Sequence, residues 1–158
     1  MAVHPVGVMT GLGLGPASRQ APPLAAPFLA LRRYPPPGLP RVGAPALGPY
    51  MVAKGFEGQA HHATWGQPYG AQGLCPPKRN SRGPWPQRLR RWLAGGRQIV
   101  ETVYEKLWPT FRLDRERPHD LSGFQVRLAA KMALHNFCIW LNEQLGRPRL
   151  AFADLVNW

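Results

Sequence analysis

The sequence predicts an α/β protein in which a segment without regular structure, residues 1–49, precedes a small domain, residues 50–146, and a tail, residues 147–158. Residues 1–50 contain 11 of the 19 prolines and no Asp or Glu. Because proline lacks the backbone donor that helices and inner strands need, we expect this part to be disordered or polyproline-like. After it, short apolar runs favour strands and longer periodic runs favour helices.

Two short strands are expected at the start of the domain. The run at residues 50–53 is apolar and leads into Gly55, and a second run at residues 72–75 is followed directly by two prolines. Both runs are bounded by turn-forming residues, as strands commonly are.

Two helices are expected in the middle of the domain. A short basic helix over residues 86–94 begins at a proline, which is acceptable in a first turn, and ends at Gly95 and Gly96. Residues 97–108 carry β-branched side chains that favour a strand, but their apolar residues recur at helical spacing. We therefore predict a helix there, stopped by Pro109. The residues with this spacing are Val100, Val103, Tyr104 and Leu107.

The longest helix is expected over residues 122–145. Ser122 followed by Gln125 matches a capping box, and Gly146 followed by Pro148 is a typical stop. Apolar side chains occur around much of the circumference of this helix. Such a helix is normally buried against a sheet or other helices.

The net charge of +12 indicates a polyanionic partner. Residues 51–158 hold 16 Lys or Arg against 8 acids. This excess favours nucleic acid, with an acidic membrane surface or a solvated protein without such a partner as the alternatives. Trp85 and Trp92 lie among the arginines, where they can stack on bases or pack against helices, and packing is the preferred interpretation. The residues expected to contact phosphates are Lys78, Arg79, Arg82, Arg88, Arg90 and Arg91.

Several classes of function have no support in the sequence. Cys75 and Cys138 lie 63 residues apart without a CxxC motif, so we expect no disulfide framework, no zinc site and a reduced, cytosolic setting. The adjacent His61 and His62 are expected in a surface loop, because neighbouring side chains diverge. We expect no signal peptide and no membrane helix, and motifs of phosphate loops, serine hydrolases and zincins do not occur.

Three stretches, taken together, resemble a known family. They are AKGFEG at 53–58, PPKRNSRGPWPQRLRRWLAGGRQIVETVYEKL at 76–107 and FRLDRERPHDLSGFQVRLAAKMALHNFCIWLN at 111–142. In this order they resemble the C-terminal part of an insertion-sequence transposase of the DDE superfamily. The resemblance implies an incomplete ribonuclease H-like domain made of its C-terminal strands and helices. It also implies DNA, in particular transposon ends, as the partner, with a homo-oligomer as a further expectation and no membrane.

The resemblance implies metal-dependent chemistry at Glu101. These families use two Asp and one Glu to hold two divalent ions, usually Mg²⁺, during phosphodiester cleavage and strand transfer. Their Glu lies on a helix, in a signature of Tyr, two residues, Arg, three residues, Glu, six residues and Lys. Arg97 and Glu101 match this spacing, whereas Ala94 and Trp108 stand at the Tyr and Lys positions. The resemblance thus makes Glu101 the catalytic residue and metal ligand, with Arg97 and Lys106 as DNA contacts. The alternative is a surface ion pair between Arg97 and Glu101.

Both catalytic Asp residues of the family are missing. The strand before KGF normally ends in the second Asp, where this sequence has Ala53, and residues 1–50 contain no Asp to serve as the first. Because two hard cations need shared carboxylates, we expect Glu101 alone to bind Mg²⁺ weakly and the chain alone to carry out no transposition. One hypothesis is that residues 1–52 are read in a different frame from the ancestral gene. A non-catalytic nucleic-acid-binding module and a non-functional remnant are the alternatives.

Overall fold

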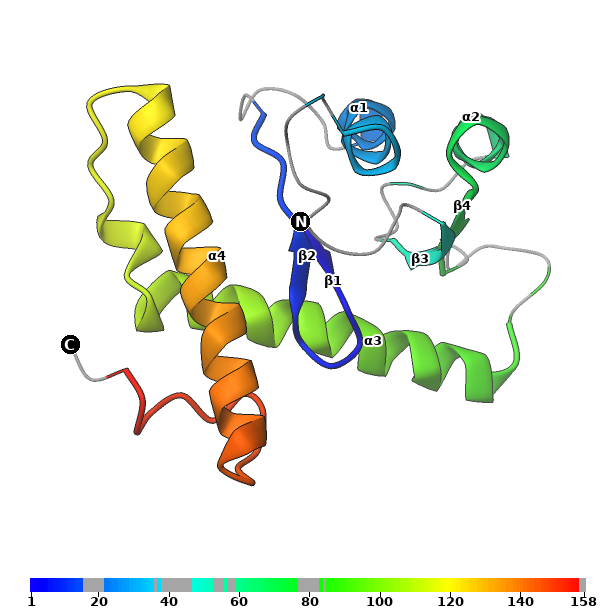
Figure 1. The fold of residues 1–158 in the computed structure, drawn as a ribbon. Coiled ribbons are helices and arrows are strands. Elements are labelled where there is room, and N and C mark those ends of the chain that lie inside the picture. Colours follow the sequence, from blue (N-terminus) through cyan, green and yellow to red (C-terminus); the bar gives the residue numbers. More distant parts are fainter. Residues whose placement is uncertain are drawn as a thin grey trace. The chain divides into compact units, whose positions relative to one another are not determined.

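The chain is a mixed α/β protein in which helices dominate (Figure 1). It divides into two compact units: unit 1 comprises Met1–Met9 with Gln98–Trp158, and unit 2 comprises Thr10–Arg97. In the part of the chain that is described, no helix has the length and apolar composition needed to cross a membrane. The computed structural model describes residues 1–15, 22–35, 37, 47–52, 56, 59–76, 83 and 85–156, with only the backbone for 59–63.

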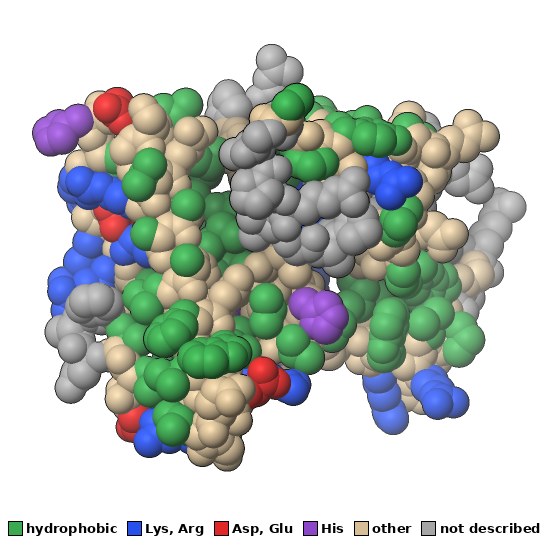
Figure 2. Space-filling view, in the orientation of Figure 1, with side chains coloured by type: hydrophobic (Ala, Val, Ile, Leu, Met, Phe, Trp, Pro, Cys, Tyr) green, Lys and Arg blue, Asp and Glu red, His purple; other side chains and the backbone are tan. Residues whose placement is uncertain are grey.

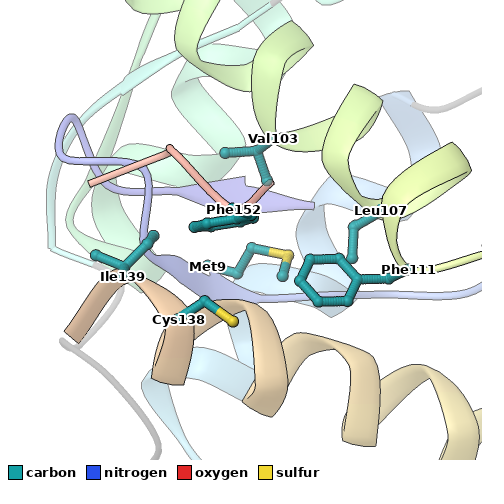
Figure 3. Close-up of a cluster of buried hydrophobic side chains, with 7 residues drawn as sticks. All are labelled: Met9, Val103, Leu107, Phe111, Cys138, Ile139 and Phe152. Atoms are coloured by element: carbon teal, nitrogen blue, oxygen red, sulfur yellow. The ribbon is translucent and has the colours of Figure 1, made fainter. Parts of the chain in front are cut away.

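Unit 1 is built on the second half of a long helix, α3 (Gln87–Glu105), and on α4 (Leu121–Gln144). Between them lie a π-helical turn, η2 (Lys106–Thr110), and a 3-10 turn, η3 (Leu113–Arg115). The strand β1 (Ala2–Val3) pairs with β2 (Met9–Gly11) in a two-stranded sheet. Seven buried side chains from these elements and the C-terminal tail converge in the core shown in Figure 3: Met9, Val103, Leu107, Phe111, Cys138, Ile139 and Phe152.

The N-terminal segment differs from its expected lack of regular structure. Within residues 1–49 the structure has β1, β2, the helix α1 (Pro22–Arg33) and the start of a strand, β3 (Gly48–Met51). The prediction is wrong here because scattered apolar side chains find partners: Met9 is only 3% exposed and Leu29 only 4%. The two prolines that open α1 lie in its first turn, where a missing backbone donor costs nothing. Parts of this predicted segment lie outside the described residues, namely 16–21, 36 and 38–46.

Unit 2 contains a β-α-β arrangement. The strands β3 and β4 (Ala71–Leu74) are parallel, with Gly48 opposite Ala71 and Met51 opposite Leu74, and α2 (Gln59–Tyr69) connects them. Parallel neighbours require such a crossover, since a tight hairpin can join only antiparallel strands. The two predicted strands are confirmed with shifts of one or two residues. Buried Trp65 from α2 lies edge-on to Phe56, at 5.8 Å between ring centroids.

The helix α3 is continuous where the glycine pair was expected to divide it. The prediction that Gly95 and Gly96 end the basic helix is wrong, although each glycine costs a helix interior about 1 kcal/mol. One reason is packing: a Cβ on Gly96 would collide with the side chain of Met51, so the glycine admits that side chain against the helix. The helix predicted from residue 97 is confirmed as far as Glu105, and η2 then carries Pro109.

In the second half of α3, fewer apolar residues are buried than their helical spacing predicted. Val103 and Leu107 are buried, whereas Val100 and Tyr104, from the same predicted apolar stripe, are exposed. The Tyr104 ring stacks on Trp108, at 5.7 Å between centroids. An exposed aromatic pair on the helix surface thus replaces the expected core contact.

The ends of α4 show which sequence signals were effective. Asp120, and not Ser122, is the N-cap, and its carboxylate accepts a hydrogen bond from the Gly123 N–H. At the other end Gly146 has a positive φ of 65°, and its N–H donates to the Glu143 carbonyl in a Schellman-type stop, as predicted. The expectation of burial around much of the circumference is wrong, since large apolar residues remain exposed. They include Val126, Phe137 and Trp140.

Candidate nucleic-acid interface

The first half of α3 presents the exposed basic residues predicted to contact phosphates. Arg88, Arg90 and Arg91 are all exposed there. Residues 58–100 contain seven Lys or Arg and no acid, so no carboxylate from this stretch of sequence can neutralise them. Figure 2 shows Lys and Arg side chains next to hydrophobic ones where Figure 1 places this half of α3. The remaining predicted phosphate contacts, Lys78, Arg79 and Arg82, lie outside the described residues.

The helical repeat sorts these residues onto two sides. With 3.6 residues per turn, Arg88, Arg91, Trp92 and Gly95 lie on one side of α3. Buried Leu93, only 7% exposed, marks the packed side, where Gly96 lies against the Met51 side chain of unit 2. Arg90 and Arg97 lie on the far side of Leu93 from Trp92, along the other edge of the packed side. The interface therefore has a basic face with an aromatic centre and a second basic edge.

Trp92 is the aromatic centre of this face. It is 53% exposed, so packing, the preferred interpretation of this tryptophan, is wrong, while Trp85 is half-buried. A shallow hollow of about 290 Å³ opens beside the indole. It is lined by Pro86, Arg88, Leu89 and Trp92.

The electrostatics of α3 favour an anion at this end. No acidic residue occupies its first turn, and Arg88 stands there in place of one. A cation near the positive end of a helix dipole is unfavourable by roughly 0.3–1 kcal/mol, and a bound phosphate would relieve this repulsion. The helix end and the arginines thus attract the same kind of ligand.

Basic residues in unit 1 are arranged differently, because acids pair with several of them. Glu116 accepts from Lys131 at 2.8 Å and from Arg127 at 2.9 Å. The hydrogen bond from Lys131, which has the largest effect, and the one from Arg127 hold the pKa of Glu116 below its usual range. Glu143 pairs with Arg149 at 2.6 Å. Internal pairing makes these cations weaker candidates for phosphate than those of α3.

The residues around Glu101 do not fit the metal site implied by the family resemblance. Glu101 and Arg97 are exposed and lie one turn apart on α3, and each takes part in an interaction with another residue. Among the described residues, no group of three His, Cys, Asp or Glu side chains could hold a metal ion. Ala53, at the place of the family's second Asp, lies outside the described residues. A two-metal centre needs several shared carboxylates, which Glu101 alone does not supply.

Lys106, another predicted DNA contact, lies beside the core of unit 1. It is half-buried, and its ammonium lies 6.0 Å from the centroid of the buried Phe152 ring. A cation placed over an aromatic face in this way stabilises the core. Lys106 therefore also packs within unit 1, and its contact with DNA stays a prediction.

Two adjacent polar residues on α4 were missed as structural determinants. His135 is fully buried, and its Nε2 lies 3.1 Å from the Gly7 carbonyl oxygen. Burial lowers the pKa of His135, and the hydrogen bond to Gly7 opposes this shift. The neighbouring Asn136 accepts from the Met9 N–H and donates to the Met9 carbonyl, both at 2.9 Å. Their only signal in the sequence is that they interrupt an apolar helix.

Comparisons with known proteins do not assign the chain to a family. No protein-family model matches it, and neither the curated proteins nor the solved structures contain a significant match. The resemblance to DDE transposases therefore remains a prediction from the three stretches of sequence. The functional conclusion has to rest on the chemistry of the α3 surface.

Proposed function

We propose that this chain is a DNA-binding protein of DDE transposase descent that does not transpose DNA by itself. The observation that carries the proposal is the exposed set Arg88, Arg90 and Arg91 on α3, within a stretch of sequence that contains no acid. Such a surface binds backbone phosphates without needing to read bases. DNA is preferred to an acidic membrane surface because the resemblance to DDE transposases implies DNA as the partner.

The order of elements supports the descent. The resemblance implies a strand that ends just before position 53 and a helix after the sheet that carries the Glu. In this chain β3 ends at Met51, two residues before Ala53, and Glu101 lies on α3, which follows β4. We interpret β3, α2, β4 and the helices after them as what remains of a ribonuclease H-like domain.

The missing Asp residues argue against catalysis by the chain alone. When bound in a complete site, Mg²⁺ would activate the attacking oxygen and stabilise the leaving one. Glu101 would be one ligand of such a site, and the described residues contain no group of three His, Cys, Asp or Glu side chains that could hold the ion. We further propose a cytoplasmic protein, in keeping with DNA as the partner and with Cys75 and Cys138 as free thiols. A homo-oligomer remains an expectation from the resemblance.

Salt-dependent DNA binding tests the proposal. We would measure fluorescence anisotropy of a labelled duplex over a series of salt concentrations with the wild type and with the Arg88→Ala, Arg90→Ala, Arg91→Ala triple variant. Alanine keeps the helix propensity high, so α3 should remain folded. If all three side chains contact phosphates, the slope of log K against log salt should become shallower by about 2.7, which is 0.9 per lost contact.

A charge-matched control distinguishes DNA binding at the α3 arginines from attraction of DNA by the net positive charge of the whole chain. The Arg115→Ala, Arg117→Ala, Arg147→Ala variant also removes three exposed cations, but from unit 1, and leaves the same net charge of +9, which is +12 less three. We expect it to bind nearly as well as the wild type. Equal weakening by both triple variants, no binding at all, or tighter binding to acidic vesicles than to DNA would overturn the proposal.

Nicking assays test the absence of catalysis. The wild type, incubated with supercoiled plasmid and Mg²⁺, should release no more nicked product than Glu101→Ala does. Nicking by the wild type that requires Mg²⁺ and disappears in Glu101→Ala would show that the chain completes a metal site after all. The DNA-binding part of the proposal would be unaffected by that result.

A further inference from the structure

We propose that Trp92 stacks on an unpaired nucleobase, so that the α3 surface prefers single-stranded DNA to duplex. The inference rests on the proposed DNA-binding function and specifies the form of DNA that the site takes. It begins from the exposure of the indole, more than half of which is accessible on a helix whose neighbouring positions are basic.

The hollow beside Trp92 provides a place for a base. Its volume of about 290 Å³ approaches the lower end of small-ligand sites, which begin near 300 Å³. Pro86 and Leu89 contribute apolar surface, and Arg88, which carries a guanidinium, is the fourth lining residue. A planar ring could lie against the indole with its edge toward this apolar surface.

The helical turn that follows Trp92 is open on the side of Gly95. Gly95 follows Trp92 by one helical turn, and a Cβ built on it would meet nothing within 4 Å. Arg88 lies one turn before Trp92 and Arg91 is its neighbour, and both are exposed. A nucleotide could therefore bring its base to the indole over Gly95 while its phosphates reach Arg88 and Arg91.

Stacking on the face of a base requires that the base be unpaired. In a duplex both faces are covered by neighbouring bases, so an exposed indole can gain this contact only from a single strand or an extruded nucleotide. The arginines contact phosphates in either form. Trp92 is therefore expected to decide between single strand and duplex, and the arginines to decide affinity for both.

Trp140 offers a matched control for the indole. It is also 53% exposed, but it lies on α4 with the Phe137 ring 5.6 Å away, and its neighbours within one turn include the acid Glu143 and no Lys or Arg. Loss of an exposed tryptophan in itself should affect both variants alike. A difference between Trp92→Ala and Trp140→Ala would come from the particular surroundings of Trp92.

The experiment compares a short labelled single strand with a hairpin duplex by fluorescence anisotropy, using the full chain. The wild type should bind the single strand more tightly. Trp92→Ala should weaken single-strand binding by about tenfold, the effect of losing one base stack, and weaken duplex binding far less. Trp92→Phe should keep most of the affinity, and Trp140→Ala all of it. Circular dichroism of each variant checks that the helices are retained.

The outcomes separate this inference from the function on which it rests. Equal weakening of single-strand and duplex binding by Trp92→Ala, or an equal effect of Trp140→Ala, would overturn the role of Trp92. Duplex binding that depends on the three arginines, with no single-strand preference, would refute the stacking while the proposed function stands. If neither form of DNA binds, both fail.

Discussion

Replacement of Asn136 tests whether the N-terminal strand belongs to the fold. The amide of Asn136 makes two hydrogen bonds with Met9, one to its N–H and one to its carbonyl, across 127 positions of sequence. Asn136→Ala removes the amide that makes both bonds. It leaves the N–H and the carbonyl of Met9 without these hydrogen bonds, in a residue that is only 3% exposed. An unsatisfied buried polar group costs roughly 1–3 kcal/mol, and partial access of water places each of these near the lower end. We therefore expect a loss of about 2 kcal/mol.

That loss would be a large part of the stability of unit 1. At about 0.05–0.15 kcal/mol per residue, its 70 residues correspond to roughly 3.5–10 kcal/mol in total. Urea unfolding followed by far-UV circular dichroism measures the change as a lower midpoint. Asn136→Asp should cost more, because it keeps the acceptor for the N–H but turns a carboxylate oxygen toward the Met9 carbonyl. Gln125→Ala, exposed on the same helix, is the control and should stay within about 0.5 kcal/mol of the wild type.

A small effect would refute the reasoning. If Asn136→Ala costs no more than Gln125→Ala, the Met9 contacts contribute nothing to stability. The N-terminal residues would then behave as their composition alone predicts, as a segment without regular structure. Unchanged unfolding of Asn136→Asp would point to the same conclusion.

Three further predictions concern caps, glycines and pH. Asp120→Ala should lower the free energy of unfolding by about 1 kcal/mol in urea titrations, whereas Ser122→Ala should change it by less than about 0.5 kcal/mol. A larger loss in Ser122→Ala than in Asp120→Ala would show that Ser122 is the N-cap, as the capping box predicts. Gly95→Ala, which meets open space, should stabilise α3 by roughly 0.5–1 kcal/mol. Gly96→Ala should stabilise the helix less, because its Cβ must displace the Met51 side chain. Thermal unfolding of both variants measures the difference, and an equal gain in stability would contradict the contact with Met51. The lowered pKa of His135 means that the folded state keeps this ring neutral, so its contribution is complete above pH 6.5 and declines as the pH falls below it. The slope should reach at most about 1.4 kcal/mol per pH unit, and an unchanged pH profile in His135→Gln would exclude this histidine as its source.

Secondary structure could be predicted where local signals agree. The short strands lie within one or two residues of their predicted positions, and the apolar period after residue 97 correctly predicts the second half of α3. The α4 stop followed from Gly146, which tolerates a positive φ. Local signals do not locate the start of α4: Asp120 and Ser122 are both good N-caps, and only the position of the first helical turn distinguishes them.

The candidate interface could be predicted in its charges but not in its shape. The excess of arginines over acids is visible in the sequence, and Arg88, Arg90 and Arg91 are exposed as expected. The exposure of Trp92 was not predictable, because indoles among arginines occur both in cores and on surfaces. The internal pairing of Lys131 with Glu116 likewise depends on chain segments that meet only in the folded unit.

The sequence by itself determined what is covalent or local: the acid-free basic stretch, the helical periods and the absence of Asp at the positions where the family resemblance requires it. Only the tertiary structure decided that Met9 enters the core, that His135 and Asn136 hold the N-terminal strand, and that α3 continues through Gly95 and Gly96. The physical reason is that each of these outcomes depends on partners distant in the chain. Propensity contributes a few tenths to about 1 kcal/mol per residue, and a buried contact or an unpaired polar group outweighs it.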